Sequence, residues 1–347
     1  MLILDEPTSA LTFDEVKSLF KVVEDLKSKG IGIFYITHRL SEVFEIATHV
    51  AIMRDGLITI HGPVSDFTRE DLVKGLLPPN AEAVQKAHSN TENVVDYSAE
   101  PVLELKNFSG YGFTDINLKV YPGEILGVAG VVGAGRTEMA TTIFGMDKVL
   151  GGKVFLRGQD ITGQKTRNVI KSGLNYVPED RHQNGLFKIC DVSANTTSAN
   201  LHSSDMGRVM LNRRAEAEVT QKYVDIFRTK ITGLDQLTGD LSGGNQQKIV
   251  IGRSLATAPK IIILDEPTRG IDAAARGDVY ASIQKLREQG VSILLISSDM
   301  EEIVELTDRA VTMYQGRINA EFKKDDINQD NLMAAAFGIL EKEVEGA

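Results

Sequence analysis

The sequence predicts an α/β protein built from two related domains, of which the first is incomplete. Residues 2–58 align without a gap with residues 262–318, at a constant offset of 260. Both copies run as an apolar strand, a turn bearing two carboxylates, an amphipathic helix and a second apolar strand. Before the second copy only, a glycine-rich turn at residues 130–137 joins a strand to a helix. The repeat, the alternation and this turn together indicate a parallel core sheet.

The first copy is predicted to occupy residues 1–77, as the carboxyl-terminal part of a domain. Its strand, helix, strand and helix lead to a short strand pair turned by Asp55-Gly56, which matches Gln315-Gly316 in the second copy. The second copy has about 160 residues of its own in front of it, from Val102 onward, without a counterpart before the first. We therefore expect that the front of the first domain is missing, through truncation, a broken reading frame or an artificial boundary.

The remainder of the chain divides by composition. Residues 78–100 are polar and rich in Pro, Asn and Ser without periodicity, which predicts a linker. The second domain is expected at residues 101–338, with a tail at 339–347. Residues 101–124 alternate apolar and polar side chains around a Pro-Gly turn, so an antiparallel β element should precede the glycine-rich turn.

Composition excludes several classes of function. The chain has 347 residues, 38 basic against 48 acidic, and a net charge of −10, without a basic block. Nucleic acid is therefore not expected as a partner. The single cysteine, Cys190, excludes an internal disulfide and leaves no thiolate cluster for a metal. No apolar run is long enough to span a membrane and no signal peptide is recognisable, so the protein should be cytoplasmic, with a membrane partner still possible.

The glycine-rich turn has the pattern of a phosphate loop. Its sequence is Gly130-Val-Val-Gly133-Ala134-Gly135-Arg136-Thr137, between an apolar strand and a helix. Backbone N–H groups of such a loop turn inward on a polyphosphate, and the hydroxyl of Thr137 is placed to ligate Mg²⁺. Arg136 stands where lysine is usual, and its bulkier, forked head is not a neutral replacement.

A carboxylate pair follows the strand at residues 261–264. Asp265 suits a water bound to Mg²⁺, and Glu266 suits a general base that orients water toward a γ-phosphate. By itself, such a pair is more often a solvated turn. The phosphate loop about 130 residues upstream and the second occurrence of the pair, as Asp5 and Glu6, favour the chemical interpretation.

Two further features bear on phosphate. Ser242, Gly243, Gly244 and Gln246 lie in LSGGNQQK just before a long helix, a second place for backbone N–H groups to hold phosphate. One nucleotide does not need both loops from one domain, whereas two domains packed head to tail would use both. His38 lies 32 residues after Glu6 and could contact a γ-phosphate, although a lone histidine is more often structural, and Ser298 takes its place after Glu266.

These motifs together resemble the ATP-binding-cassette superfamily. LSGGNQQK is similar to its signature sequence, LDEPT to its Walker B motif, GVVGAGRT to its Walker A motif, and His38 to its switch histidine. With YVPEDR and LDEPTRGID, residues 102–338 resemble the second half of the double-cassette ATPases of bacterial sugar-type importers, in the ribose and autoinducer-2 group. Residues 2–77 resemble the end of the first cassette.

The resemblance implies a P-loop cassette with a parallel core sheet, an antiparallel β subdomain and an α-helical signature subdomain, after a partial copy. It implies ATP and Mg²⁺ as ligands, hydrolysis that drives import of a sugar-like molecule, and transmembrane permease subunits as partners. A periplasmic or extracellular substrate-binding protein would take part indirectly. The chain would lie peripherally at the cytoplasmic face of the inner membrane, and a homodimer is possible.

In this family each ATP lies between the Walker motifs of one cassette and the signature of the other. The site of Asp5, Glu6 and His38 would be completed by residues 242–246 but lacks its own Walker A motif. The site of residues 130–137 with Asp265 and Glu266 lacks the opposite signature. Neither composite site is whole within one copy of this chain.

Departures from the family pattern gather in the second site. Arg136 replaces the Walker lysine, Ser298 the switch histidine, and Glu179 the glutamine that senses Mg²⁺ and the membrane subunit. These changes indicate binding with slow or absent hydrolysis. The adenine-stacking aromatic is expected near Tyr111 or Phe113, and the spacing does not choose between them.

Two other functions compete with an importer ATPase. A non-hydrolysing, nucleotide-binding remnant is favoured by the missing first Walker A motif and by the pair of Arg136 and Ser298. A soluble cassette ATPase that acts on DNA or ribosomes would need a basic surface or a long coiled coil, and the net charge of −10 argues against it.

Overall fold

The computed structural model divides the chain into two compact units. Unit 1 comprises Met1–Asn93 with Asp272–Ala274, and unit 2 comprises Val94–Ile271 with Ala275–Ala347. The structure describes residues 1–8, 13–37, 40–54, 56–68, 71–72, 95–201, 203, 206–207, 210–271 and 273–338. Most of the expected linker and the whole expected tail lie outside these residues. Among the described residues, no helix combines the length and the apolar character needed to cross a bilayer.

The centre of unit 2 is a six-stranded sheet. Its strand order is β10 (Leu174–Val177), β11 (Ile261–Asp265), β12 (Ser292–Ser297), β7 (Ile125–Gly130), β13 (Arg309–Tyr314) and β14 (Arg317–Lys323). All neighbours are parallel except β13 and β14. Strands β7, β10, β11 and β12 are buried along their whole length, as expected for a parallel sheet that is covered on both faces.

An antiparallel sheet packs on one side of this core. Its order is β6 (Phe113–Val120), β5 (Leu103–Gly110), β8 (Gly151–Leu156) and β9 (Gln159–Asp160). The predicted antiparallel element before the phosphate loop is therefore present, and β8 and β9 extend it after the loop. Ile261 and Ile263 of β11 share one hydrophobic cluster with β5, β6 and α5 (Arg136–Ile143).

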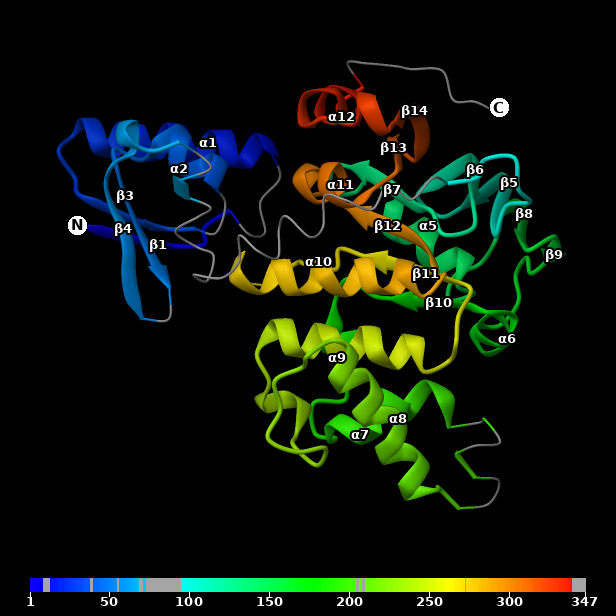
Figure 1. Ribbon diagram of the computed structural model, residues 1–347. Coiled ribbons are helices and arrows are strands. Elements are labelled where there is room, and N and C mark those ends of the chain that lie inside the picture. Colours follow the sequence, from blue (N-terminus) through cyan, green and yellow to red (C-terminus); the bar gives the residue numbers. More distant parts are fainter. Residues whose placement is uncertain are drawn as a thin grey trace. The chain divides into compact units, whose positions relative to one another are not determined.

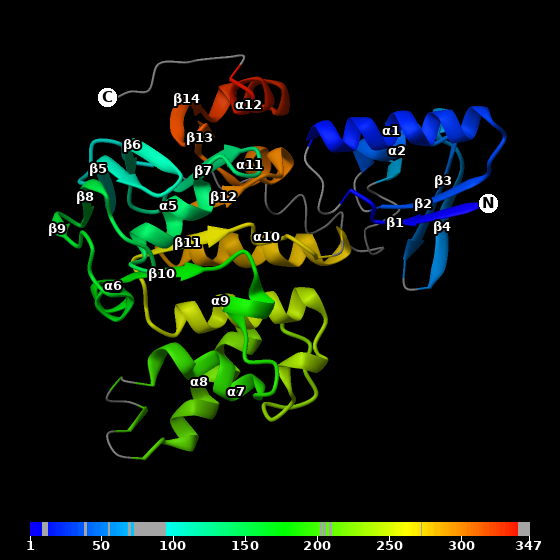
Figure 2. The same ribbon diagram turned by 180° about the vertical axis from the view of Figure 1, so that it is seen from behind.

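Helices cover the other face of the central sheet. Ile262 and Leu264 belong to a second cluster with apolar side chains of α9 (Gly243–Leu255), α10 (Ala273–Glu288), α11 (Met300–Leu306) and α12 (Gln329–Ala336). Figures 1 and 2 show α9 grouped with α7 (Val192–Thr197) and α8 (Arg213–Ile226), away from α5 and from the antiparallel sheet. The short helix α6 (Thr166–Ser172) leads into β10. The predicted helical subdomain around the signature is thus a separate group of helices.

Unit 1 repeats the last part of unit 2 strand for strand. Its elements are β1 (Leu2–Asp5), α1 (Phe13–Ser28), β2 (Ile33–Ile36), α2 (Leu40–Ile46), β3 (His49–Arg54) and β4 (Leu57–Pro63). Leu2 pairs with Ile33 in parallel, as Ile262 pairs with Ile293, at the offset of 260. The β3–β4 ladder shifts register between Ile52 and Met53, and the β13–β14 ladder does so between Thr312 and Met313.

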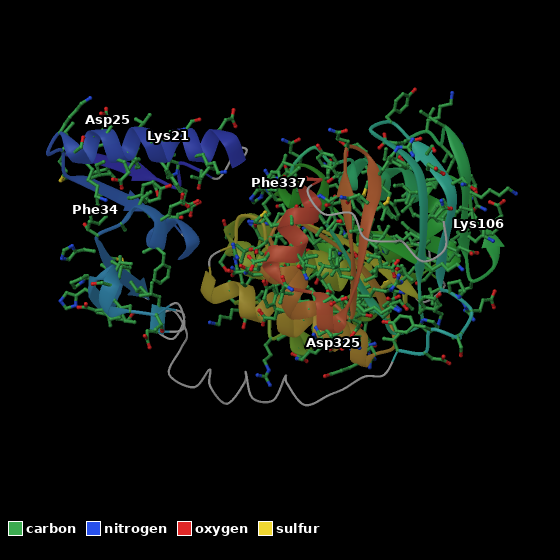
Figure 3. All side chains as sticks on the ribbon, turned by 90° about the horizontal axis from the view of Figure 1, so that it is seen from above. Lys21, Asp25, Phe34, Lys106, Asp325 and Phe337 are labelled. Atoms are coloured by element: carbon green, nitrogen blue, oxygen red, sulfur yellow. The ribbon has the colours of Figure 1, made fainter. Side chains whose placement is uncertain are left out.

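The two units differ in what covers their sheets. Ile3 and Phe34 are 59% and 61% exposed, whereas the matching Ile263 and Leu294 are fully buried. Leu4, Ile33 and Tyr35 point the other way, toward Phe20 and Val23 of α1, and Figure 3 shows Phe34 on the side of β2 away from Lys21 and Asp25 of that helix. Among the described residues of unit 1, no strand pairs with both β2 and β3 as β7 pairs with β12 and β13. One face of this small sheet therefore contributes little apolar burial.

The matched isoleucines give a direct test. Ile263→Ala should lower the free energy of unfolding of unit 2 by about 2–5 kcal/mol, because it leaves a cavity in a close-packed core. Ile3→Ala should lower that of unit 1 by less than about 1 kcal/mol, because the side chain is largely in water already. Urea unfolding, resolved by amide exchange in β1 and β11, measures both. Equal losses at the two positions would contradict the exposed face of unit 1.

Candidate active site

The phosphate loop links the end of β7 to the start of α5. Gly133 and Gly135 adopt left-handed backbone angles, with φ of +83° and +94°, which glycine adopts at little cost. A Cβ on Gly135 would lie 2.4 Å from the carbonyl oxygen of Gly112 in the β5–β6 turn. The N–H of Gly316 donates to the carbonyl of Ala134 over 3.1 Å. Two hairpin turns therefore brace the loop, and the start of α5 suits an anion, because the first N–H groups of a helix lack intrahelical acceptors.

Arg136, the first residue of α5, points into the carboxylate pair. It is 6% exposed, and its Nη2 lies 3.1 Å from Oε1 of Glu266, which is 9% exposed. The same Oε1 accepts the backbone N–H of Ser298 at 2.7 Å. Nη1 of Arg136 is buried and has no hydrogen-bond partner among the described residues. One half of this guanidinium thus neutralises Glu266, and the other half is available to a second anion.

Asp265 is fully buried at the tip of β11. Its Oδ2 accepts the hydroxyl of Tyr176 at 3.0 Å. Burial raises the pKa of Asp265 to about 6, although its interactions with Tyr176, Thr137 and Arg136 oppose the rise. The hydroxyl of Thr137 on α5 therefore faces the carboxylate that the sequence assigned to Mg²⁺.

Glu266 follows in a strained backbone conformation. Its φ is +46°, and its N–H donates to the carbonyl of Ile296 at 2.8 Å. Burial raises the pKa of Glu266, against the opposing charge of Arg136. Glu6 in unit 1 has the same geometry, with φ of +42° and an N–H bond to Ile36 at 2.9 Å. A positive φ in a residue other than glycine costs free energy, and its presence in both units points to a functional turn.

Two buried polar atoms without a hydrogen-bond partner among the described residues show whether Mg²⁺ and phosphate fit this site. Oδ1 of Asp265, like Nη1 of Arg136, is buried and has no hydrogen-bond partner among the described residues. A carboxylate oxygen beside a threonine hydroxyl is a hard donor set of the kind that Mg²⁺ prefers. A guanidinium N–H beside a helix start suits a phosphate oxygen. The residues present therefore fit a magnesium nucleotide.

The signature residues lie in the helical group of α7, α8 and α9. Ser242 is the N-cap of α9 and accepts a hydrogen bond from Nδ2 of Asn245 at 2.9 Å. Gly243 and Gly244 form the first turn of this helix. Gln246 is 4% exposed, and its Nε2 donates to the carbonyl of Thr238 at 3.1 Å. Figures 1 and 2 show the start of α5 and the helical group in different parts of unit 2.

The remaining predicted residues are placed as follows. Asp5 and Glu6 are exposed at the tip of β1. Glu179 forms an ion pair with the guanidinium of Arg269 in the turn after Glu266. His38 lies outside the described residues. The structure thus brings together Arg136, Thr137, Asp265 and Glu266, whereas Glu179 has a side-chain partner of its own.

Sequence reasoning missed one member of the site and left another undecided. The sequence predicts no role for Tyr176, because only the strand order places β10 beside β11. Of the two aromatic candidates, Phe113 is 3% exposed and packs on Phe108, with ring centroids 5.4 Å apart. Tyr111 is 64% exposed and precedes Gly112, which touches the phosphate loop.

Comparison with known proteins identifies the family and the fold. Residues 113–269 match the ABC transporter family. The autoinducer 2 import ATP-binding protein LsrA of Enterobacter sp. (strain 638) is 38% identical over 97% of this chain and 68% of its own length. An ATP-binding cassette of an ABC transporter in its ADP conformation shares the fold with a TM-score of 0.58 and 22% identity, over 68% of this chain and 96% of that one. A dimeric bacterial ABC transporter cassette has a TM-score of 0.56 and 21% identity, over 64% and 98%.

The fold and the site define a P-loop ATP-binding cassette. The chain belongs to the family of ABC transporter ATPases, which bind ATP and hydrolyse it to drive transport.

The raised pKa of Asp265 predicts a dependence of stability on pH. The folded chain binds the Asp265 proton more tightly than the unfolded chain, because the pKa rises from 3.8 to about 6. The free energy of unfolding therefore falls as pH rises through that window, by on the order of 3 kcal/mol in all. Asp265→Asn removes the buried charge and should stabilise the nucleotide-free chain at pH 8, with a smaller gain at pH 5.

Urea unfolding at the two pH values measures the difference. Asp235→Asn, at an exposed aspartate, is the matched control and should change stability by less than about 0.5 kcal/mol at both. A gain for Asp265→Asn that does not depend on pH would mean that desolvation of the carboxylate is not its cause.

Proposed function

We propose that this chain is an ATP-binding subunit that energises import of a sugar-like small molecule through a membrane ABC transporter. The observation that carries the proposal is the convergence of Arg136 and Thr137 from α5 with Asp265 and Glu266 from β11. The 38% identity to an autoinducer 2 import ATP-binding protein supports the importer and the substrate class. Autoinducer 2 or a ribose-type monosaccharide is the proposed cargo.

The phosphate loop would hold the nucleotide. Backbone N–H groups of Gly130, Gly133, Ala134 and Gly135, with the start of α5, would bind the phosphates, and Nη1 of Arg136 would donate to a terminal oxygen. Bound Mg²⁺ would neutralise phosphate charge, held by Thr137 and Asp265. Glu179 is a further candidate for this metal, once its pair with Arg269 opens.

Glu266 would act on water. Its carboxylate, held by the N–H of Ser298, would orient a water molecule toward the terminal phosphate and accept its proton. The raised pKa of Glu266 increases its basicity. Its ion pair with Arg136 opposes this role, so release of Glu266 would accompany the entry of phosphate.

The second cassette of the working unit would complete each site. Ser242, Gly243, Gly244 and Gln246 would meet a nucleotide bound by a partner, and Asp5, Glu6 and His38 would belong to the other composite site. Dimeric cassettes among the solved structures support this arrangement. The proposed partners are transmembrane permease subunits, with a substrate-binding protein acting indirectly, and the proposed location is the cytoplasmic face of the inner membrane.

A non-hydrolysing nucleotide-binding protein is the alternative. The observation that favours it is the buried pair of Arg136 and Glu266, which occupies the general base. Ser298 in place of a switch histidine points the same way. The two functions share nucleotide binding and differ in turnover.

The first test is ATP binding. The full chain should bind MgATP, and Gly135→Ala should weaken binding by more than about 100-fold, because its Cβ would collide with Gly112 and distort the loop. Gly163→Ala is the matched control, since this glycine also has a positive φ but no atom within 4 Å of the added Cβ. Titration calorimetry measures both, and equal affinities would exclude the loop as the nucleotide site.

The exposed aromatic ring predicts a second effect on affinity. Tyr111→Ala should weaken MgATP binding by about tenfold through lost stacking on adenine, a loss of about 1.4 kcal/mol. Tyr97→Ala, at another exposed tyrosine of unit 2, is the control and should leave affinity unchanged. Inorganic triphosphate has no base and serves as the control ligand. If ATP and GTP, like inorganic triphosphate, bound Tyr111→Ala as tightly as they bind the native chain, Tyr111 would have no part in the site.

Turnover separates the two functions. Reconstituted with permease subunits and a complete partner cassette, the native chain should support ATP hydrolysis that Glu266→Gln or Glu6→Gln lowers by at least about tenfold. Phosphate release measures it. Binding without any hydrolysis that depends on these carboxylates would establish the alternative.

A further inference from the structure

Three segments of unit 2 meet at the side chain of Arg181. This residue begins η2 (Arg181–Gly185), a π-helical turn that follows β10. It is 8% exposed. Its Nη1 donates to the carbonyl of Arg269 at 2.8 Å, and its Nη2 donates to the carbonyl of Gly270 at 3.0 Å. Because both carbonyls lie just after Asp265 and Glu266, the guanidinium fixes the backbone of the turn that carries the candidate base.

The third segment is the start of the signature helix. A Cβ on Gly243, the first residue of α9, would lie 2.8 Å from Nη2 of Arg181 and 3.4 Å from the carbonyl oxygen of Gly270. No side chain fits between them without displacing the guanidinium. The glycine of the signature therefore packs directly on Arg181.

Glu179 provides a second tie between the same turns. Two residues before Arg181, its carboxylate pairs with the side chain of Arg269. The N–H of Arg269 in turn donates to the carbonyl of Glu266 at 3.0 Å. The turn after β10 thus holds the turn after β11 through one side-chain pair and two backbone carbonyls.

Burial of the Arg181 guanidinium costs free energy, so stabilisation of the fold alone does not explain this arrangement. The guanidinium is bound to neutral carbonyls, and its Nε is buried without a hydrogen-bond partner among the described residues. Burial lowers the pKa of Arg181, and the nearby charge of Asp180 offsets only part of this. The Asp180 carboxylate itself caps η2, where it accepts the N–H groups of His182 and Gln183. A buried cation held in such fixed geometry suits a role in positioning.

We propose that Arg181 is a positioning residue that fastens the start of α9 and the turn at Arg269–Gly270 to the turn that carries Glu179. When nucleotide binds to the phosphate loop, these three segments change conformation together. Nucleotide binding therefore alters the signature residues at the start of α9. The inference deepens the proposed function, because it rests on nucleotide binding at residues 130–137.

Hydrogen exchange of the full chain without nucleotide tests the fastening itself. Arg181→Gln keeps a donor but loses the fork and the charge, and Arg181→Lys keeps the charge. Arg214→Gln is the matched control, at an arginine whose side chain is 90% exposed on α8. In Arg181→Gln, amides of residues 243–248 and 269–271 should exchange about tenfold faster than in the native chain. Arg181→Lys should restore part of the protection, and the control should match the native chain.

Saturating MgATP tests the transmission. In the native chain, nucleotide should slow exchange at residues 243–248. In Arg181→Gln this response should be lost although the Kd for MgATP stays within about threefold of native. A merely structural role would instead lower the Tm, weaken nucleotide binding and speed exchange throughout unit 2.

Three results would overturn the proposal: unchanged exchange at residues 243–248 in nucleotide-free Arg181→Gln, a native chain that binds MgATP without any response there, or uniform destabilisation of unit 2. Failure of the proposed function can be distinguished from failure of the proposal about Arg181. In that case the native chain binds no MgATP, and the nucleotide-free comparison still decides whether Arg181 fastens the three segments.

Discussion

Two adjacent carboxylates remain buried where the apolar strand β11 ends, and the rest of the site follows from this constraint. Asp265 is fully buried and Glu266 is 9% exposed. Desolvation of such groups is costly unless neighbouring groups offset it. Tyr176 and Thr137 supply hydroxyls to Asp265, and Arg136 supplies a charge to Glu266. Tyr176 comes from β10, whereas Thr137 and Arg136 both come from α5, so elements far apart in the sequence are needed to assemble the site.

The burial of the two carboxylates also explains why the site suits ligands that bind and leave. The polar groups around it are only partly satisfied, because Oδ1 of Asp265 and Nη1 of Arg136 have no hydrogen-bond partner among the described residues. A cation beside the first atom and an anion beside the second would complete the network. The folded chain is thus less stable at this site without ligand, and binding of the two ions would restore the lost stability, which is common at functional sites.

The internal repeat separates local backbone preference from burial. Glu6 and Glu266 share a positive φ and the same bond to the neighbouring strand. Ile3 and Ile263 share a strand position but differ from 59% exposed to fully buried. The turn conformation therefore follows from the local sequence and the adjacent strand, whereas the environment of the carboxylates depends on α5 and the antiparallel sheet, which lie over this face in unit 2.

Local patterns were sufficient for much of the molecule. The glycines at 130, 133 and 135 predicted the loop, alternation predicted the antiparallel sheet, and the offset of 260 predicted matching strands in the two units. These features depend on neighbours in sequence, through backbone freedom, side-chain periodicity and strand ends.

What the sequence by itself determined is therefore the family, the order of elements and the residue types at the phosphate loop and the carboxylate pair. Only the tertiary structure decided which side chains meet. Tyr176 reaches Asp265 across 89 positions, Arg136 reaches Glu266 from another strand–helix unit, and Arg181 joins three segments. It also separated exposed Tyr111 from buried Phe113. The physical reason is that burial and long-range pairing arise from strand order and packing, which no single stretch of the chain contains.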